Sequence, residues 1–254
     1  MPIHVAFPPN GLLPVVAWSG PLPKDTQLPA HSGQAMVLFC FDGLMRVEVD
    51  EDRWFIPDRY GIWIPAGTVP RVKTSDDIEF QAFQLHPKFD ARIAMPQQPT
   101  VLRATPLIRG IARRLTQPAP LTVAQQRRLG WVALDEIARL ERPNLHLPGS
   151  DDARVSAVMA HVMADPRRAA SLSQLARTIG SSERTLSRLF LTETGMTWRD
   201  WRDRLRFVLS LEGLQAGKGS TDIAVSLGYS SPSAFVAAFR RQSGMTPTEW
   251  RHQR

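Results

Sequence analysis

The sequence is poor in three features, and each scarcity excludes a class of protein. Cys40 is its only cysteine, so no disulfide can form within the chain, and a reducing compartment is expected. It has no signal peptide and no apolar run long enough to cross a bilayer, which predicts a cytoplasmic protein with no membrane partner. Lysine is scarce as well. Four of the 31 basic residues are lysine and the rest are arginine, which suits phosphate and guanine contacts, although a GC-rich genome gives the same bias.

The positive charge of the chain is unevenly distributed. The 254 residues allow two ordinary domains, each with its own core, and their formal net charge of +7 favours a polyanionic partner. Residues 151–254 carry 15 basic and 10 acidic side chains, whereas residues 1–150 carry 16 and 14. The excess of positive charge therefore lies mostly in the C-terminal part.

The first half of the chain has the pattern of short strands. Residues 1–30 are rich in proline and predict an extended arm or edge segment. Further along, Met45, Val47 and Val49 alternate with charged residues, as on a half-buried strand. Several such runs between about residues 28 and 86, separated by turn signals, predict a sandwich or a barrel.

Helical periodicity begins near residue 102 and continues to residue 141. Leu107, Ile111 and Leu115 form one apolar stripe, and a second stripe includes Val132 and Ile137. These two helices either pack within the chain or pair with a second subunit, and their periodicity does not decide between the two. The proline- and glycine-containing segment 143–150 then predicts an interdomain linker.

The last third of the chain states one residue pattern twice. The first copy reads Leu175-Ala-x-x-Ile-Gly180, then Leu186-x-x-Leu-Phe190, then Thr194-Gly-Met-Thr197. The second copy reads Ile223-Ala-x-x-Leu-Gly228, then Phe235-x-x-Ala-Phe239, then Ser243-Gly-Met-Thr246. The second copy has one extra residue, Tyr229. Each copy predicts a short helix, a glycine, a tight turn and a second helix. That is the outline of a helix-turn-helix, whose second helix lies in the DNA major groove.

The exposed faces of the two predicted reading helices differ in chemistry. Arg184, Ser187 and Arg188 share one face of the first, and arginine makes two hydrogen bonds to guanine, so Arg188 is the first candidate for base readout. The alternative is an arginine that is merely solvated. The matching face of the second copy offers few donors, and the arginines at its end suit phosphates. The predicted DNA-binding residues are Ser182, Arg184, Thr185, Ser187, Arg188, Ser233, Val236, Ala237, Arg240 and Arg241.

On these stretches, residues 151–254 resemble the DNA-binding domain of the AraC/XylS family of bacterial transcription regulators. The resemblance implies a sequence-specific regulator that binds double-stranded promoter DNA, contacts RNA polymerase, responds to a small-molecule effector and is not an enzyme. By position, the base-contacting places of the family fall on Arg184, Ser187 and Arg188 in the first copy. In the second they fall on Pro232, Ser233, Val236 and Ala237, where the family often has polar or basic residues.

The strand region resembles the cupin-type sensor domain of many such regulators. The resemblance rests on His31, Gln34 and Trp63-Ile-Pro-Ala-Gly67. Cupins that bind metal gather several imidazoles, but the later ligand place holds Pro70 here, so no metal or other cofactor is predicted. Candidate effector-binding residues are His31, Gln34, Trp54 and Trp63, and ordinary packing is the alternative for each.

The prediction is therefore an α+β protein of two domains. Residues 1–142 form a cupin-like β-barrel followed by helices, with a possible role in homodimerisation; residues 143–150 are a linker; residues 151–254 form an all-α domain with two helix-turn-helix units. A metal-dependent cupin enzyme with an accessory helical domain is the alternative function. A non-specific nucleic-acid packing protein is a third reading, which predicts a strong salt dependence and no preferred sequence.

Overall fold

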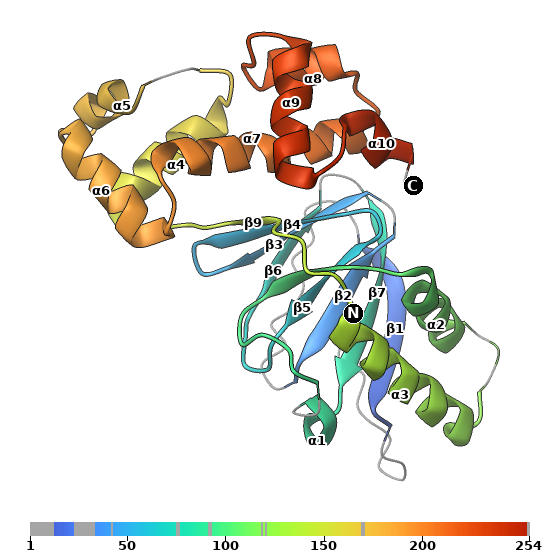
Figure 1. Ribbon diagram of the computed structural model, residues 1–254. Coiled ribbons are helices and arrows are strands. Elements are labelled where there is room, and N and C mark those ends of the chain that lie inside the picture. Colours follow the sequence, from blue (N-terminus) through green and yellow to red (C-terminus); the bar gives the residue numbers. More distant parts are fainter. Residues whose placement is uncertain are drawn as a thin grey trace. The chain divides into compact units, whose positions relative to one another are not determined.

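The structure divides the chain into a strand-rich unit and a helical unit. The computed structural model describes residues 13–22, 34–41, 43–74, 77–90, 93–117, 119, 121–168 and 171–252. The first unit holds residues up to Val49 together with Trp54–His146, and the second holds Asp50–Arg53 and Leu147–Arg254. Strands dominate the first and helices the second (Figure 1). The predicted α+β organisation, sheet-rich first and helical second, is confirmed.

Nine strands of the described residues form two sheets. The first has the order β1-β7-β2-β5-β8, with antiparallel pairing, and its central strand β2 is buried along its whole length. The second has the order β6-β3-β4-β9. The strands are β1 (Val15–Leu22), β2 (Met36–Cys40), β3 (Leu44–Val49), β4 (Asp52–Pro57), β5 (Tyr60–Ile64), β6 (Arg71–Thr74), β7 (Ile78–Leu85), β8 (Thr100–Arg103) and β9 (His146–Leu147).

The two sheets do not join into a closed barrel in the part of the chain that the structure describes. The first sheet ends at β1 and β8 and the second at β6 and β9, and no ladder links these edges. The expected cupin-like β-barrel is therefore corrected to two separate sheets. The proline-rich segment before residue 30 contributes β1, which lies at an edge, as its prolines require.

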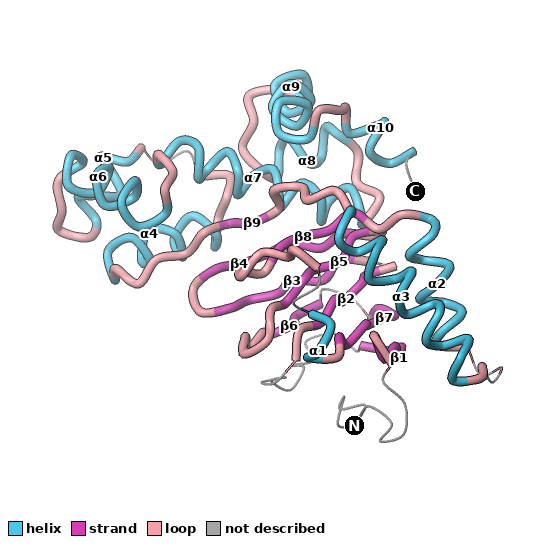
Figure 2. The backbone as a smooth tube through the Cα atoms, turned by 60° about the horizontal axis from the view of Figure 1, so that its bottom comes forward, coloured by secondary structure: helices cyan, strands magenta, loops and turns pink. Residues whose placement is uncertain are grey.

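Helices α2 (Pro106–Thr116) and α3 (Val123–Arg139) pack against the five-stranded sheet, and α1 (Pro87–Asp90) is a single turn (Figure 2). Ile108 and Ile111 of α2 are buried in one cluster with the strands, whereas Leu107 is 52% exposed and Val132 of α3 is 43% exposed. The predicted stripes are therefore wrong at Leu107 and at Val132. The helical region also begins later than residue 102, because residues 100–103 pair with β5 as β8. Packing within the chain thus accounts for the inner faces of both helices.

The second unit contains seven helices among its described residues. The predicted helix near residues 153–164 is α4, and the long predicted helix from about residue 198 is α7. Thr197 caps α7 through Asp200, as predicted. The helices are α4 (Ala153–Ala164), α5 (Leu172–Thr178), α6 (Glu183–Thr194), α7 (Trp198–Gln215), α8 (Ser220–Ser226), α9 (Pro232–Ser243) and α10 (Pro247–His252).

Candidate nucleic-acid interface

The pair α5–α6 forms as the pattern predicts. Ser171 and Gln174 make the predicted capping box at the start of α5, and Gly180 has a φ of +66° where the chain turns toward α6. Ser182 caps α6 by accepting a hydrogen bond from the backbone N–H of Thr185 at 3.1 Å. Ser182 and Thr185 are therefore occupied with the helix start and with each other, at 2.9 Å between their hydroxyl oxygens.

One face of α6 is buried and the opposite face is open. Leu186 and Phe190 have no measurable exposure, which fixes the rotation of the helix about its axis. Arg184, Ser187 and Arg188 are consequently exposed together. Among the described residues neither arginine has an ion-pair partner, so both guanidinium groups remain free to donate to a ligand.

The pair α8–α9 repeats this arrangement with less polar chemistry. Phe235 and Phe239 bury one face of α9, and Ser231 caps its start. On the opposite side Ser233, Ala237 and Arg240 are exposed, whereas Val236 is half-buried and Arg241 lies 3.5 Å from the carboxylate of Asp203 on α7. The open face of α9 therefore offers fewer hydrogen-bond donors than that of α6.

Helix α7 connects the two pairs and supplies much of their core. Trp201 is fully buried, and its ring packs edge-on against Phe190 of α6 at 6.0 Å between centroids. Further along α7, Phe207 packs against Phe239 of α9 at 5.2 Å. Helix α7 thus contacts α6 near its start and α9 near its middle through aromatic rings.

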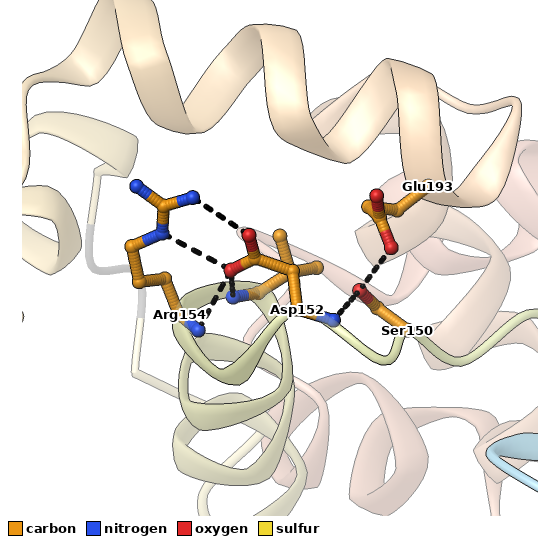
Figure 3. Close-up of polar contacts among 5 residues, drawn as sticks. Ser150, Asp152, Arg154 and Glu193 are labelled. Carbon is orange, nitrogen blue, oxygen red and sulfur yellow. Dashed lines mark hydrogen bonds and ion pairs between the residues drawn. The ribbon is translucent and has the colours of Figure 1, made fainter.

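A polar cluster ties the start of α4 to the end of α6 (Figure 3). The hydroxyl of Ser150 donates to the carboxylate of Glu193 at 3.1 Å and accepts from the backbone N–H of Asp152. Asp152 caps α4 and binds Arg154 through two side-chain hydrogen bonds of 3.1 and 2.7 Å. The hydrogen bond from the Arg154 side chain lowers the pKa of Asp152 to about 2.

Residues 147–150, inside the predicted linker, are buried in or bonded to the helical unit. The indole N–H of Trp201 donates to the carbonyl of Pro148 at 2.8 Å. The backbone N–H of Gly149 donates to the carboxylate of Asp52, also 2.8 Å away. Asp52 lies in the segment Asp50–Arg53, where the turn after β3 leads into β4, and this segment belongs to the same unit. The sequence signal that was available here, a proline-glycine break, indicates irregular backbone but not its partners. The proposed boundaries of the linker stay a prediction.

Three of the four predicted effector-binding residues lie in the described part of the chain, and each has a partner outside the predicted set. Trp63 is 4% exposed in the core of the first unit, and its indole N–H donates to the carbonyl of Pro96 at 2.9 Å. Trp54 is buried and stacks on His146 at 4.7 Å between ring centroids. Gln34 accepts a short hydrogen bond from Gln84. His31 lies outside the described residues.

The described residues form neither a metal-ligand cluster nor a membrane-spanning helix. No three His, Cys, Asp or Glu side chains gather there as a metal ion would require. No helix in those same ranges is both long enough and apolar enough to cross a membrane.

Comparison with known proteins agrees with this geometry. A family model described as a helix-turn-helix domain matches residues 175–253. The HTH-type transcriptional regulator NimR of Escherichia coli is 30% identical over 226 residues, which cover 86% of this chain and 80% of NimR. A putative AraC-like transcription regulator of Streptomyces lividans is 33% identical over 106 residues, 41% of this chain and 35% of that protein. The solved structure of ToxT from Vibrio cholerae covers 94% of this chain and 98% of ToxT at 10% identity, with a TM-score of 0.40.

The repeated helix pairs and the match over most of the chain define a DNA-binding transcription regulator. The protein belongs to the AraC-type family of helix-turn-helix regulators. Its relatives regulate transcription and are not enzymes, so the alternative of a metal-dependent cupin enzyme is set aside. The predicted class of function is confirmed.

Proposed function

We propose that α5–α6 and α8–α9 are two helix-turn-helix units, and that the protein reads promoter DNA chiefly through α6. The observation that carries this proposal is the exposed row of Arg184, Ser187 and Arg188, held outward by the burial of Leu186 and Phe190. Arginine in the major groove donates two hydrogen bonds to guanine O6 and N7, and serine bonds either base type. This row therefore has the donors that sequence discrimination requires.

Helix α9 contributes more to the position of the protein on DNA than to discrimination between base sequences. Ala237 and the half-buried Val236 offer only methyl contacts to thymine, and Ser233 is the one hydroxyl on this face. Arg240 is exposed in the last turn of α9 and suits a backbone phosphate, whereas Arg241, predicted as a second phosphate contact, is engaged by Asp203. We infer that α9 fixes the register of the protein on DNA while α6 selects the sequence.

The length of α7 sets the geometry of this complex. Its 18 residues span about 27 Å at 1.5 Å per residue. Major-groove faces on one side of straight DNA repeat about every 34 Å. Two reading helices held by a connector of this length match the groove repeat best when the DNA bends toward the protein, at a cost on the order of a few kcal/mol.

Selection of bound sites from random DNA, followed by titration of variants, tests the assignment. Arg188→Ala should weaken binding to the selected site by about 1–3 kcal/mol and relax the preference at one base pair. Arg177→Ala is a matched control, because Arg177 is also exposed in the α5–α6 pair but lies on α5. An equal loss on random DNA for Arg188→Ala would reassign this residue to a phosphate.

We further infer that the strand-rich unit is the sensor and responds to a small molecule. Among the predicted effector-binding residues, Gln34 is half-exposed, whereas Trp54 and Trp63 are buried and also pack within the core. Gln34→Ala should therefore lower effector affinity. It also removes the acceptor of the buried Gln84, so it should lower the unfolding temperature as well, but by less than Trp63→Phe. A screen of metabolites by thermal shift measures the two effects together.

RNA polymerase and a second copy of the chain are the remaining proposed partners. Leu107 and Val132 stay 52% and 43% exposed on α2 and α3 although the inner faces of these helices are packed, so a homodimer through this side is the form we propose. Sedimentation of wild-type protein and of Leu107→Ser tests it. A wild-type monomer at micromolar concentration would refute this interface and leave the DNA assignment untouched.

A further inference from the structure

A group of arginines beside the second reading helix takes no part in the base contacts proposed above. Arg202 and Arg206 lie on α7, one turn apart, and Arg241 lies at the end of α9. The one carboxylate known to be paired among them is Asp203, which is 3.5 Å from Arg241. Three guanidinium groups and one paired carboxylate thus lie on these parts of α7 and α9, which leaves an excess of positive charge at this place.

Arg206 is in an unusual environment for a charged side chain. It is 8% exposed, and its Nε is buried without a hydrogen-bond partner among the described residues. Burial, followed by repulsion from Arg202, lowers the pKa of Arg206 from its ordinary value. Arg202 repeats the pattern, since its Nε is likewise buried and unpartnered. Because both Nε atoms are covered, only the terminal nitrogens of the two guanidinium groups can meet a ligand.

An aromatic ring supports each of these two guanidinium groups. The Cζ atom of Arg206 lies 5.3 Å from the centroid of Tyr229, and that of Arg202 lies 6.0 Å from the centroid of Trp198. A cation–π contact uses the face of the guanidinium plane and leaves the N–H groups in that plane free. The rings therefore orient both arginines without consuming the donors that bind a phosphate.

The cluster lies beside the proposed DNA-contacting row of α9. Ser233, Ala237 and Arg241 follow one another at intervals of four residues, so they lie along one row of the helix. The last of them, Arg241, meets Asp203, which is the direct neighbour of Arg202 on α7. Backbone phosphates border the groove into which a reading helix inserts, so they are the anions nearest to this end of the row.

We propose that Arg202 and Arg206 together bind one backbone phosphate of the DNA strand that borders the groove occupied by α9. Trp198 and Tyr229 hold the two guanidinium groups in place, and Arg241 neutralises Asp203, which would otherwise repel the phosphate. This proposal rests on the proposed role of α9 in DNA binding. Tyr229, the one residue by which the second copy of the repeat exceeds the first, then acts as a positioning residue for Arg206.

Neutral methylphosphonate linkages, placed one at a time in the selected DNA site, test the proposal on the full chain. For the wild-type protein, one linkage on the α9 side should lower affinity about tenfold, because a charged hydrogen-bonded contact is lost. Arg206→Met should lower affinity for unmodified DNA by a similar factor and should lose nothing further at that linkage. Arg128→Ala, which removes an exposed arginine of α3, is the charge-matched control and should keep the full sensitivity to that linkage.

The outcomes separate a phosphate contact from a purely structural role. If Arg206→Met keeps the full tenfold sensitivity at every linkage, Arg206 only packs and the proposal is overturned. If Arg206→Met does not fold, Arg202→Gln, at a half-buried position, carries the same comparison and must show the same loss of sensitivity. If Arg188→Ala relaxes the preference at one base pair as expected, but Arg206→Met keeps the wild-type sensitivity to every methylphosphonate linkage, only the proposed phosphate site is refuted. If the wild-type protein shows no sequence preference at all, the proposed base readout by α6 is refuted instead.

Discussion

Gly149→Ala is the substitution for which the structure gives the sharpest expectation. An alanine Cβ at this position would lie 1.9 Å from the carbonyl oxygen of Glu51 and 2.3 Å from its carbonyl carbon. Both are backbone atoms, so no flexible side chain can move aside. The turn Asp50–Arg53 must shift, and the 2.8 Å hydrogen bond from Gly149 to Asp52 is then lost or lengthened.

The size of the effect follows from two losses. Overfilling a packed site costs about 1–3 kcal/mol. A hydrogen bond to a charged acceptor contributes about 1.5–3 kcal/mol, and since the same shift causes both losses they overlap. We expect the free energy of unfolding to fall by about 2–4 kcal/mol. With a urea dependence of about 2 kcal/mol per molar, the unfolding midpoint should fall by about 1–2 M.

Urea unfolding followed by far-ultraviolet circular dichroism measures this change. Gly110→Ala is the matched control, because a Cβ at Gly110 of α2 meets no atom within 4 Å, and alanine there should stabilise the helix by up to about 1 kcal/mol. Asp52→Ala removes the hydrogen bond without the clash and should give a smaller loss. A midpoint for Gly149→Ala equal to that of the wild type would refute the close approach of the turn to residue 149.

Three further predictions concern single side chains. Trp201→Phe removes the hydrogen bond to Pro148 and should lower stability by about 1 kcal/mol in thermal unfolding, whereas an unchanged unfolding temperature would mean that the bond contributes nothing. Burial raises the pKa of Tyr60 to about 12. The stability that depends on its neutral phenol is therefore complete below about pH 10 and is lost as the pH rises toward 12. Tyr60→Phe should abolish this loss when unfolding is measured between about pH 9 and 12. Arg154 lowers the pKa of Asp152 to about 2. The contribution of this helix cap to stability is therefore complete above about pH 4 and disappears as the pH falls through 2. Asp152→Asn should flatten that part of the acid-unfolding curve, and an unaltered curve would contradict the role of Asp152 as a cap.

Local signals in the sequence were sufficient for the helical unit. Capping residues such as Ser171 and Thr197, and glycines at positions of positive φ such as Gly180, define helix ends through contacts within a few residues. The buried and exposed faces of α6 follow from a period of 3.6 residues. For this reason the row of Arg184, Ser187 and Arg188 was recognisable before its exposure was known.

Features that depend on distant partners were not recognisable. The pairing of residues 100–103 with β5 turns an expected helix start into a strand, and only the sheet edge explains it. Whether the strands close into a barrel depends on which edges meet, which alternation of residues does not encode. No sequence pattern distinguishes Arg202 and Arg206 from other arginines on a helix, because the ring over Arg206 belongs to a residue more than twenty positions away.

The turn Asp50–Arg53 has a consequence for how such regulators exchange parts. It is encoded within the strand region, yet it is grouped with the helical unit and reaches Gly149 there. A chimaera that joins this helical unit to another sensor at residue 147 leaves these four residues behind. Its designer therefore has to transplant two stretches of sequence, the helical unit and the four residues that contact it.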